Sequence, residues 1–365
     1  MLTKELWNSS LINIIKFLAK EWLSVVLTLI LATTSYYTNS FVSYTSSEIE
    51  VIFILFLLLL VVHGLQRSNL LSYIASSIEK GKAIPLKLIL TTFFLSMVVT
   101  NDVTLIIMVP LSLAINISHK EYIVILEAIS ANAGSSLTPI GNPQNLFIYW
   151  HYKVPIDTFM ITISPLVVFF LVVLSLFSFI LFSNIKRYTI DTKIYKINQK
   201  AYIYALFLAV IILIVVHILP VIYGLFIVMF VVALDIKTLK IDYPLLFNFL
   251  LFFGIADNLS ILFEDYISHF NDIFLLSAFS SQIISNVPAT LLISNFTSNW
   301  QDLLWGSSIG GFGSLVGSLA NLIAYRIYIT HENSSHKLSF TIKFIAIGYV
   351  AFILGIVLYR YIKPF

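Results

Sequence analysis

The sequence predicts an all-α polytopic membrane protein with two inverted-topology repeats, each containing a re-entrant hairpin and a discontinuous transmembrane helix. Three observations lead to this fold class. Hydrophobic residues make up 59% of the 365 residues and charged residues only 11%, whereas ordinary globular domains carry roughly a quarter charged residues. Several apolar stretches reach the length of about 20 residues that a helix needs to cross a bilayer. Finally, each half of the chain contains two polar interruptions in otherwise apolar sequence.

Seven apolar stretches predict continuous membrane helices, because each can span the hydrocarbon core and contains few charges. They cover residues 22–42, 49–66, 158–182, 201–219, 221–236, 244–262 and 340–360. The first 22 residues lack a compact apolar core followed by a small-residue cleavage site. They therefore predict an amphipathic helix at the membrane surface and not a cleaved signal. Residues 68–82 mix apolar and polar side chains and are also expected along the interface.

The first interruption of each half divides an apolar segment into two pieces that are too short for a comfortable crossing. In residues 84–117 the interruption is TNDVT at 100–104, and in residues 273–297 it is SNVPAT at 285–290. Each segment therefore predicts a re-entrant hairpin with the polar residues at its tip.

The second interruption of each half lies in a segment that is long enough to cross but is broken by Gly, Ser, Asn or Pro. SANAGSSLTPIGNPQN breaks residues 121–152, and GSSIGGFGSLVGSLAN breaks residues 302–330. Irregular backbone at bilayer depth is tolerated only where it is buried in protein or lines a polar cavity. Paired interruptions of this kind mark the midplane binding site of a secondary transporter, so both segments predict discontinuous helices.

Lysine and arginine accumulate in alternate loops, and this sets the expected orientation because cytoplasmic loops are enriched in them. The basic segments are the N-terminus and residues 67–87, 183–200, 237–240 and 331–343. In contrast, the 38–48 loop has no basic residue and the 263–272 loop is acidic. The pattern predicts a cytoplasmic N-terminus, with the first hairpin entering from the cytoplasm and the second from outside.

The chain is therefore expected to form one membrane transporter domain over residues 1–365. Its parts are a first repeat at 22–182, a cytoplasmic loop and linking helix at 183–220, and a second, inverted repeat at 221–360. Similar residues recur at matching interruptions, in the pairs Asn101 and Asn286, Gly141 and Gly317, and Asn145 and Asn321.

The helix ends at the four interruptions predict a binding site, because free N–H groups suit an anion and free carbonyl groups suit a cation. The candidate solute- and ion-binding residues are Asn101, Asp102, Thr104, Thr138, Gly141, Asn142, Asn145, Ser285, Asn286, Thr290, Ser314, Gly317, Ser318 and Asn321. Sodium is a candidate ligand of Asn101, Asp102 and Asn286. The alternative is that these small and polar residues only pack the helices together.

Two carboxylates lie close to the interruptions. Asp102 is at the first hairpin tip, where a carboxylate could bind a cation or carry a proton. The alternative is that Asp102 only caps the second hairpin helix. Glu127 precedes the first broken helix's interruption and is either functional or a satisfied buried acid.

The motifs TNDVTLIIMVP, GSSLTPIGNPQNL, SQIISNVPATLL and GSLVGSLANL resemble the ion transporter superfamily. That group includes arsenite efflux pumps, sodium–proton antiporters and divalent-anion/sodium symporters, and the greatest similarity is to citrate-transporter-like "anion transporter" permeases. The resemblance covers about residues 50–330 and implies two inverted repeats. Symporters of the group carry Ser-Asn-Thr at the hairpin tips, where Asn and Thr help to hold sodium. Here the tips read Thr-Asn-Asp and Ser-Asn-Val, which look more like the arsenite-pump branch.

These features predict an ion-coupled secondary transporter of the cell membrane (the inner membrane of a bacterium) that moves a small anionic or oxyacid solute by alternating access. The alternatives are a sodium–proton antiporter of the same fold group and an integral membrane enzyme. No HExxH or GxxxxGK[ST] motif is present, so no catalytic residue or cofactor is expected, and any ATP drive would need a partner chain. The expected partners are lipid, the solute, and a proton or sodium ion, with no nucleic acid. A homodimer is a candidate assembly.

Overall fold

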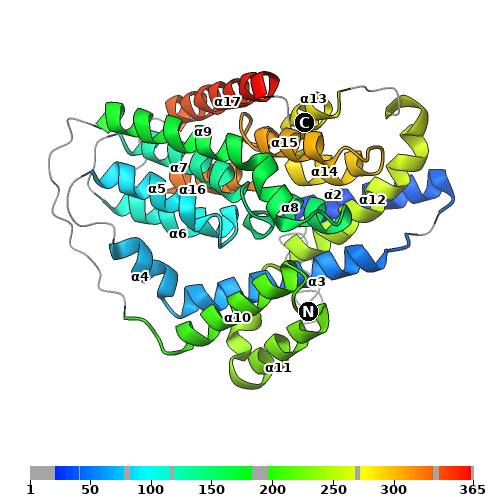
Figure 1. The fold of residues 1–365 in the computed structure, drawn as a ribbon, viewed down its shortest axis with the longest axis horizontal. Coiled ribbons are helices and arrows are strands. Elements are labelled where there is room, and N and C mark those ends of the chain that lie inside the picture. The colour runs from blue at the N-terminus through cyan, green and yellow to red at the C-terminus, as the bar shows by residue number, and fades with distance from the viewer. Residues whose placement is uncertain are drawn as a thin grey trace, which may run out of the picture.

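The computed structural model describes residues 21–40, 42–77, 83–115, 119–182, 196–267, 272–331 and 337–362, and these form helices and turns without a strand (Figure 1). Within these ranges, the helices long and apolar enough to cross a membrane are α3 (Ser46–Arg67), α9 (Ile156–Phe182), α12 (Tyr243–Ile267) and α17 (Lys337–Ile362). The shorter helices α2 (Trp22–Thr38), α10 (Lys200–Val215) and α11 (Gly224–Leu234) occupy the other predicted stretches. The predicted surface helix at the N-terminus lies outside the described residues.

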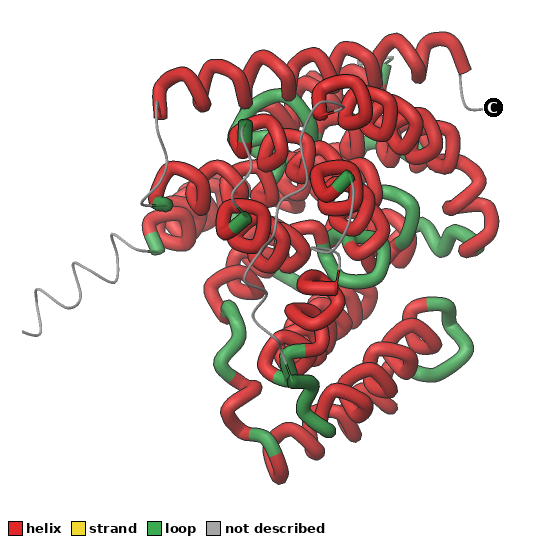
Figure 2. Tube along the Cα trace, turned by 90° about the vertical axis from the view of Figure 1, so that its left-hand side faces the viewer, coloured by secondary structure: helices red, strands yellow, loops and turns green. Residues whose placement is uncertain are grey.

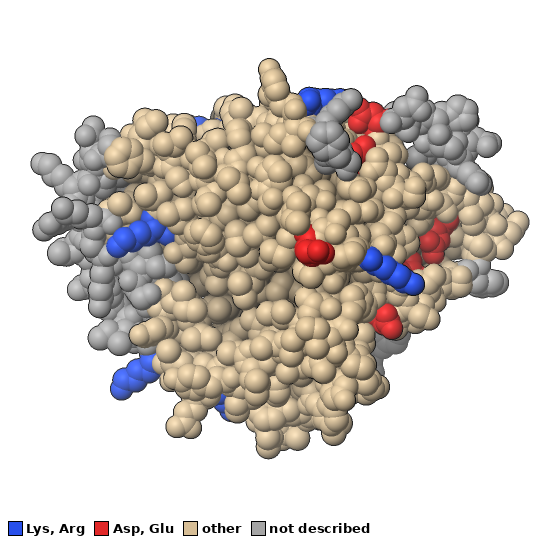
Figure 3. Space-filling view, in the orientation of Figure 1, with Lys and Arg blue, Asp and Glu red and all other residues tan. Residues whose placement is uncertain are grey.

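The outer surface of the molecule is apolar over wide areas. On α9, for example, Ile161 is 70% exposed and Ile180 72% exposed. Figure 3 shows one face on which lysine, arginine, aspartate and glutamate are few and scattered. Exposed apolar side chains on long apolar helices suit contact with lipid and not with water. The chain is therefore a multi-pass membrane protein.

Each predicted hairpin consists of two short helices that are consecutive in the chain. The first contains α5 (Ile84–Leu95) and α6 (Asn101–Ala114), and the second contains α13 (Ile273–Ile284) and α14 (Asn286–Ser294). The first turn lies slightly earlier than TNDVT, because the chain leaves α5 at Leu95 and the polar residues after Thr100 already form the first turn of α6. The second turn is a single residue, Ser285, in a left-handed backbone conformation with φ 74°.

Each predicted discontinuous helix is broken where expected. The first consists of α7 (Lys120–Ser135), the 3₁₀ turn η1 (Pro139–Gly141) and α8 (Pro143–His151). The second consists of α15 (Trp300–Gly310) and α16 (Leu319–Thr330). The second piece of each helix begins at a side-chain cap, because Asn142 accepts from the backbone N–H of Asn145 and Ser318 accepts from that of Ala320.

The first arm of each hairpin packs against the first piece of the following broken helix. In the α5–α7 contact, a Cβ on Gly134 would lie 2.0 Å from the carbonyl oxygen of Phe93. In the α13–α15 contact, a Cβ on Gly310 would lie 2.4 Å from the Cβ of Ser281. Only glycine permits helices to approach this closely. The same packing solution thus appears in both halves.

The remaining helices surround these elements. A large buried apolar cluster extends from α3 to α17, and a smaller one joins α2 to α12. Helix α17 runs along one face of the molecule (Figure 2), whereas α3, α10 and α11 form a layer on the opposite side, with α4 (Leu70–Ser77) next to them (Figure 1).

Asp235 ties that layer together at the end of α11. Lys200 lies 3.0 Å from its carboxylate, and Tyr204 and Thr238 both donate hydrogen bonds to it. These two hydrogen bonds and the neighbouring ammonium group stabilise the charged form of the carboxylate. The carboxylate therefore remains charged and holds α10 and α11 to the short turn η3 (Ile236–Leu239).

Candidate functional site

Buried asparagine side chains from three of the four interruptions form a hydrogen-bonded chain. Asn101, the first residue of α6, donates from Nδ2 to Oδ1 of Asn132 on α7 at 3.2 Å. Asn132 in turn donates from Nδ2 to Oδ1 of Asn321 on α16 at 2.8 Å. All three residues are at most 4% exposed. The chain therefore links the first hairpin and first broken helix to the second broken helix.

Asn286 brings the fourth interruption to the same place. A Cβ built on Gly311 would lie 3.1 Å from Nδ2 of Asn286 and 3.4 Å from Oδ1 of Asn132. The backbone N–H of Asn286 also donates to the carbonyl oxygen of Gly317 at 2.9 Å. We refer to Asn101, Asn132, Asn286 and Asn321 as the asparagine cluster. It is a neutral, buried set of amide groups at which the two halves of the chain meet.

The two broken helices hold their interruptions with the same bonds. The Nδ2 group of Asn145 donates to the carbonyl oxygens ten and seven residues earlier, in Ser135 and Thr138. The Nδ2 group of Asn321 donates to the carbonyl oxygens ten and seven residues earlier, in Gly311 and Ser314. Both asparagines thereby satisfy carbonyl groups that a helix end would otherwise leave free.

Hydroxyl groups repeat the pattern between hairpin and broken helix. Thr138 donates to the carbonyl oxygen of Met97 at 2.6 Å, and Ser314 donates to that of Gln282 at 3.1 Å. Each bond joins the end of a hairpin's first arm to the following interruption. The matching places thus agree in hydrogen bonding as well as in residue type.

One position breaks this agreement. Ser308 on α15 corresponds to Asn132 on α7. Each lies two residues before the glycine that packs against the hairpin, which is Gly310 in α15 and Gly134 in α7. Its Oγ is buried and has no hydrogen-bond partner among the described residues, and the same is true of Oδ1 of Asn145. The bond from Asn132 to Asn321 therefore has no counterpart in the opposite direction.

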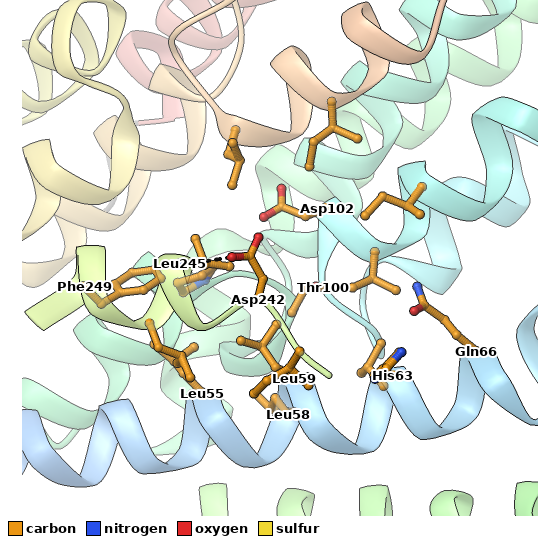
Figure 4. Close-up of a pocket in the computed structure, with 18 of the residues that line it drawn as sticks. Leu55, Leu58, Leu59, His63, Gln66, Thr100, Asp102, Asp242, Leu245 and Phe249 are labelled. Atoms are coloured by element: carbon orange, nitrogen blue, oxygen red, sulfur yellow. Dashed lines mark hydrogen bonds between the residues drawn. The ribbon is translucent and has the colours of Figure 1, made fainter. Parts of the chain in front are cut away.

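A cavity of about 240 Å³ lies beside the asparagine cluster, between α3 and the first turns of α6 and α12 (Figure 4). Its wall includes residues at the starts of three interrupted or hairpin helices: Asp102 in α6, Pro143 in α8 and Leu319 in α16. The carboxylates of Asp102 and Asp242 point toward one another across it. Asp242 also accepts a hydrogen bond from the backbone N–H of Leu245 at 3.1 Å, which caps α12.

Uncharged polar and basic side chains complete the lining of this cavity. Gln66 and Thr100 lie on its wall, together with His63 and Lys240. His63 shares a hydrogen bond of 2.9 Å with the carbonyl oxygen of Thr238. The cavity therefore combines positive helix ends with two carboxylates, and one lysine lies nearby.

The predicted site residues fall into three groups. Asn101, Asn286 and Asn321 belong to the asparagine cluster, whereas the carboxylate of Asp102 lies in the cavity, where its own backbone N–H donates to Oδ1 of Asn101. The others shape the interruptions. Thr104 donates to the carbonyl oxygen of Val99, just before α6, and Thr290 donates to that of Asn286, the first residue of α14. Ser285 makes the second turn, Asn142 and Ser318 are caps, and Gly141 and Gly317 allow close backbone contact. The three predicted sodium ligands thus divide between the cluster and the cavity.

Sequence reasoning did not identify Asn132 or Asp242. Asn132 lies within SANAGSS, a stretch that the sequence marks as an interruption. In the structure it belongs to the end of α7, which is still regular helix, and nothing in the sequence shows its partners. Asp242 resembles any aspartate before a helix, and only the fold places it opposite Asp102. Within the described ranges, no group of three His, Cys, Asp or Glu residues could hold a metal ion.

Interrupted helices, a buried polar cluster and an adjoining cavity in an apolar helical protein define a membrane transporter. The comparisons with known proteins agree. A family model described as "Citrate transporter" matches residues 11–310, and the chain belongs to that family.

Several curated proteins are similar to the chain. The uncharacterized transporter MJ0456 of Methanocaldococcus jannaschii is 35% identical over 338 residues, which cover 87% of this chain and 90% of that protein. The inner membrane protein YbiR of Escherichia coli is 32% identical over 259 residues, covering 66% of this chain and 68% of that protein. The silicon efflux transporter LSI3 of Oryza sativa subsp. japonica is 28% identical over 131 residues, which cover 34% of this chain and 27% of that protein.

Proposed function

We propose that this protein is an ion-coupled secondary transporter in which a small oxyacid or anionic solute passes between the cavity and the asparagine cluster. The observation that carries the proposal is that residues at the starts of α6, α8 and α16 all line one cavity beside a buried set of amides. Helix N-termini favour oxygen atoms that carry negative charge. The amides can donate to and accept from a hydroxylated solute.

The charges in the cavity favour an undissociated or weakly charged oxyacid over a polycarboxylate. Asp102 and Asp242 would repel a multiply charged anion, and Lys240 can offset one of them. A neutral oxyacid can instead donate to these carboxylates and accept from the helix ends. The relative named as a silicon efflux transporter supports a small inorganic solute. The family description supports a larger carboxylate, so both classes belong in the test.

The experiment is uptake into vesicles that contain the purified protein, with proton and sodium gradients imposed separately. The probes are arsenite, silicic acid and citrate. We expect accumulation of one oxyacid on one gradient, and less accumulation of citrate. Failure of every probe on both gradients would contradict the proposal.

A sodium–proton antiporter is the second candidate, because two facing carboxylates in one cavity also suit exchange of a cation for a proton. The same vesicles distinguish the two functions. An antiporter would acidify or alkalinise the lumen on a sodium gradient with no solute present, whereas a solute transporter would require the oxyacid.

Asp102 is the expected coupling group on the cavity wall. Asp102→Asn preserves the side chain's shape but cannot release a proton or hold a sodium ion by charge. We expect at least a tenfold loss of gradient-driven accumulation with solute exchange retained. Asp157→Asn is the matched control, because Asp157 is an exposed aspartate in the first turn of α9, away from the cavity. Accumulation by Asp102→Asn at the wild-type rate would leave Asp102 with a structural role alone.

A further inference from the structure

The middle of α7 contains a carboxylate that neither the cavity nor the asparagine cluster uses. Glu127 is 0% exposed, and its Oε1 accepts a hydrogen bond of 2.6 Å from the hydroxyl of Ser112 on α6. Its other oxygen, Oε2, is buried and has no hydrogen-bond partner among the described residues. Ser130, one turn further along α7, is also 0% exposed, and its Oγ likewise has no partner.

The ion pairs found among the described residues do not include this carboxylate. On α7 itself Lys120 donates to a backbone carbonyl and Glu121 pairs with Lys343. Among the charged residues on the helices packed against α7 are Lys87, Asp102, Asp157, Arg326, Lys337, Lys343 and Arg360. An isolated carboxylate buried in apolar surroundings is too costly to remain charged.

We propose that Glu127 is a proton-binding site, with Ser112 and Ser130 as its hydrogen-bonding partners. Residues three apart are neighbours on a helix surface, and side chains lean toward the helix N-terminus, which directs Ser130 toward Glu127. A proton on Oε2 turns that oxygen into a donor, and the Ser130 hydroxyl can accept from it. A single proton thus gives both unpartnered atoms a partner. One carboxylate and two hydroxyls are too few oxygen ligands for a metal ion.

The position of Glu127 connects this proton to transport, a step that rests on the proposed function. Glu127 precedes Asn132 by five residues on the same helix, about 7.5 Å along the axis. The matching place in α15 is Leu303, so the second half has no equivalent group. In each cycle the acid releases a proton to one side of the membrane, and the carboxylate takes up a proton from the other side.

Glu127→Gln tests the site because its amide mimics the protonated acid. The amide oxygen can still accept from Ser112, and the amide nitrogen can donate to Ser130. Thermal stability of the full-length protein in detergent is measured from mildly acidic to mildly alkaline pH. We expect the wild-type melting temperature to fall as the pH rises above about 4.3, the pKa of an unfolded glutamate, because the unfolded chain then releases a proton that the folded state still holds. The variant should match the wild type at acidic pH and show no such fall.

Infrared spectroscopy provides a second readout that requires no transport. The wild type should show the carbonyl band of a buried protonated carboxylic acid, and Glu127→Gln should lack it. Ser130→Ala removes the acceptor, so the folded state holds the proton less tightly and the fall in melting temperature should be smaller. Ser277→Ala is the matched control, since that hydroxyl is also buried without a partner but lies on α13, which packs against α15 in the second half. A missing acid band, or a pH dependence of the melting temperature that is the same in Glu127→Gln as in the wild type, would overturn the proton site.

Transport then separates the proton site from its role in coupling. With whichever of the three probes the wild type accumulates on a proton gradient, Glu127→Gln should retain exchange and lose at least tenfold in accumulation. Wild-type accumulation by the variant would overturn the coupling role. Failure of all three probes would count against the proposed function and against coupling at Glu127, but the spectroscopic result would still decide whether the proton is bound.

Discussion

The two broken helices share their backbone plan but not their side chains at one critical place. In both, an asparagine in the second piece ties back the carbonyls that the interruption leaves free, and a glycine in the first piece packs against the hairpin. The first helix adds Asn132, which reaches across to Asn321, whereas the second has Ser308 at the same place. The asparagine and glycine that recur stabilise the interruptions, whereas Asn132, which does not recur, links the halves. The difference teaches that, between the described parts of the two broken helices, the amide bond runs from the first half to the second and has no reciprocal bond.

The largest expected effect concerns whether the halves are inverted. The chain has no cysteine, so a single introduced cysteine reports its own side of the membrane. We expect Gln199→Cys to react with a membrane-impermeant reagent only from the cytoplasm, and Ser298→Cys only from outside. Both positions are exposed. Reaction of both from the same side would mean that the matched contacts arise without an inverted arrangement.

The next comparison is between the two close-approach glycines. Gly134→Ala places a Cβ 2.0 Å from a backbone oxygen of α5, which cannot move without separating the helices. Gly310→Ala is opposed instead by the side chain of Ser281. Overpacking of this kind typically costs about 1–3 kcal/mol. We expect both variants to unfold more easily in detergent, with the larger loss for Gly134→Ala.

A second substitution distinguishes these two obstacles. Gly310→Ala should cost less stability when it is made in the Ser281→Gly protein than when it is made in the wild type. Ser96→Gly should not rescue Gly134→Ala, because the obstacle there is the backbone of Phe93. Equal rescue in both halves would show that the two packing contacts are equivalent.

Asn132→Ser makes the first helix resemble the second. The change removes the bonds to Asn101 and Asn321, and each hydrogen bond contributes about 0.5–1.5 kcal/mol. We therefore expect a loss of about 1–3 kcal/mol in the free energy of unfolding, together with loss of transport. Ser136→Ala is the control, because Ser136 is buried nearby but its hydroxyl only bonds the backbone of its own helix. A stable, active Asn132→Ser protein would show that the asparagine cluster is not needed.

The backbone plan could be predicted from the sequence because it depends on local chemistry. Proline, glycine and asparagine stop helices where they occur, so the interruptions in 121–152 and 302–330 are visible before folding. The Asn132–Asn321 bond could not be predicted, because it joins residues 189 apart in the chain. The same holds for Asp242, which faces Asp102 only because the starts of α12 and α6 line one cavity. The sequence indicates which polar residues lie within apolar stretches, but only the fold decides which of them meet.

Ser308→Asn makes the second helix resemble the first, and it has the smallest expected effect. The Nδ2 group of Asn145 is fixed by three backbone carbonyls, so its Oδ1 must point away from them. Asn132 reaches Asn321 with its side-chain amide. An asparagine at the matching position 308 should reach Asn145 in the same way. We expect a new hydrogen bond to Oδ1 of Asn145 and a gain of about 1 kcal/mol in the free energy of unfolding.

The neighbouring residue gives the control for this gain. Ser307→Asn changes a buried serine whose hydroxyl already bonds the carbonyl oxygen of Leu304, so it should destabilise the protein. Adding Asn145→Leu should abolish the gain from Ser308→Asn, because the acceptor is then absent. Since a second bond would join the halves more firmly, Ser308→Asn should also slow exchange of the solute while stabilising the fold. The opposite outcome is that Ser308→Asn destabilises the protein both alone and together with Asn145→Leu. The α8–α15 contact would then have no room for an amide at position 308.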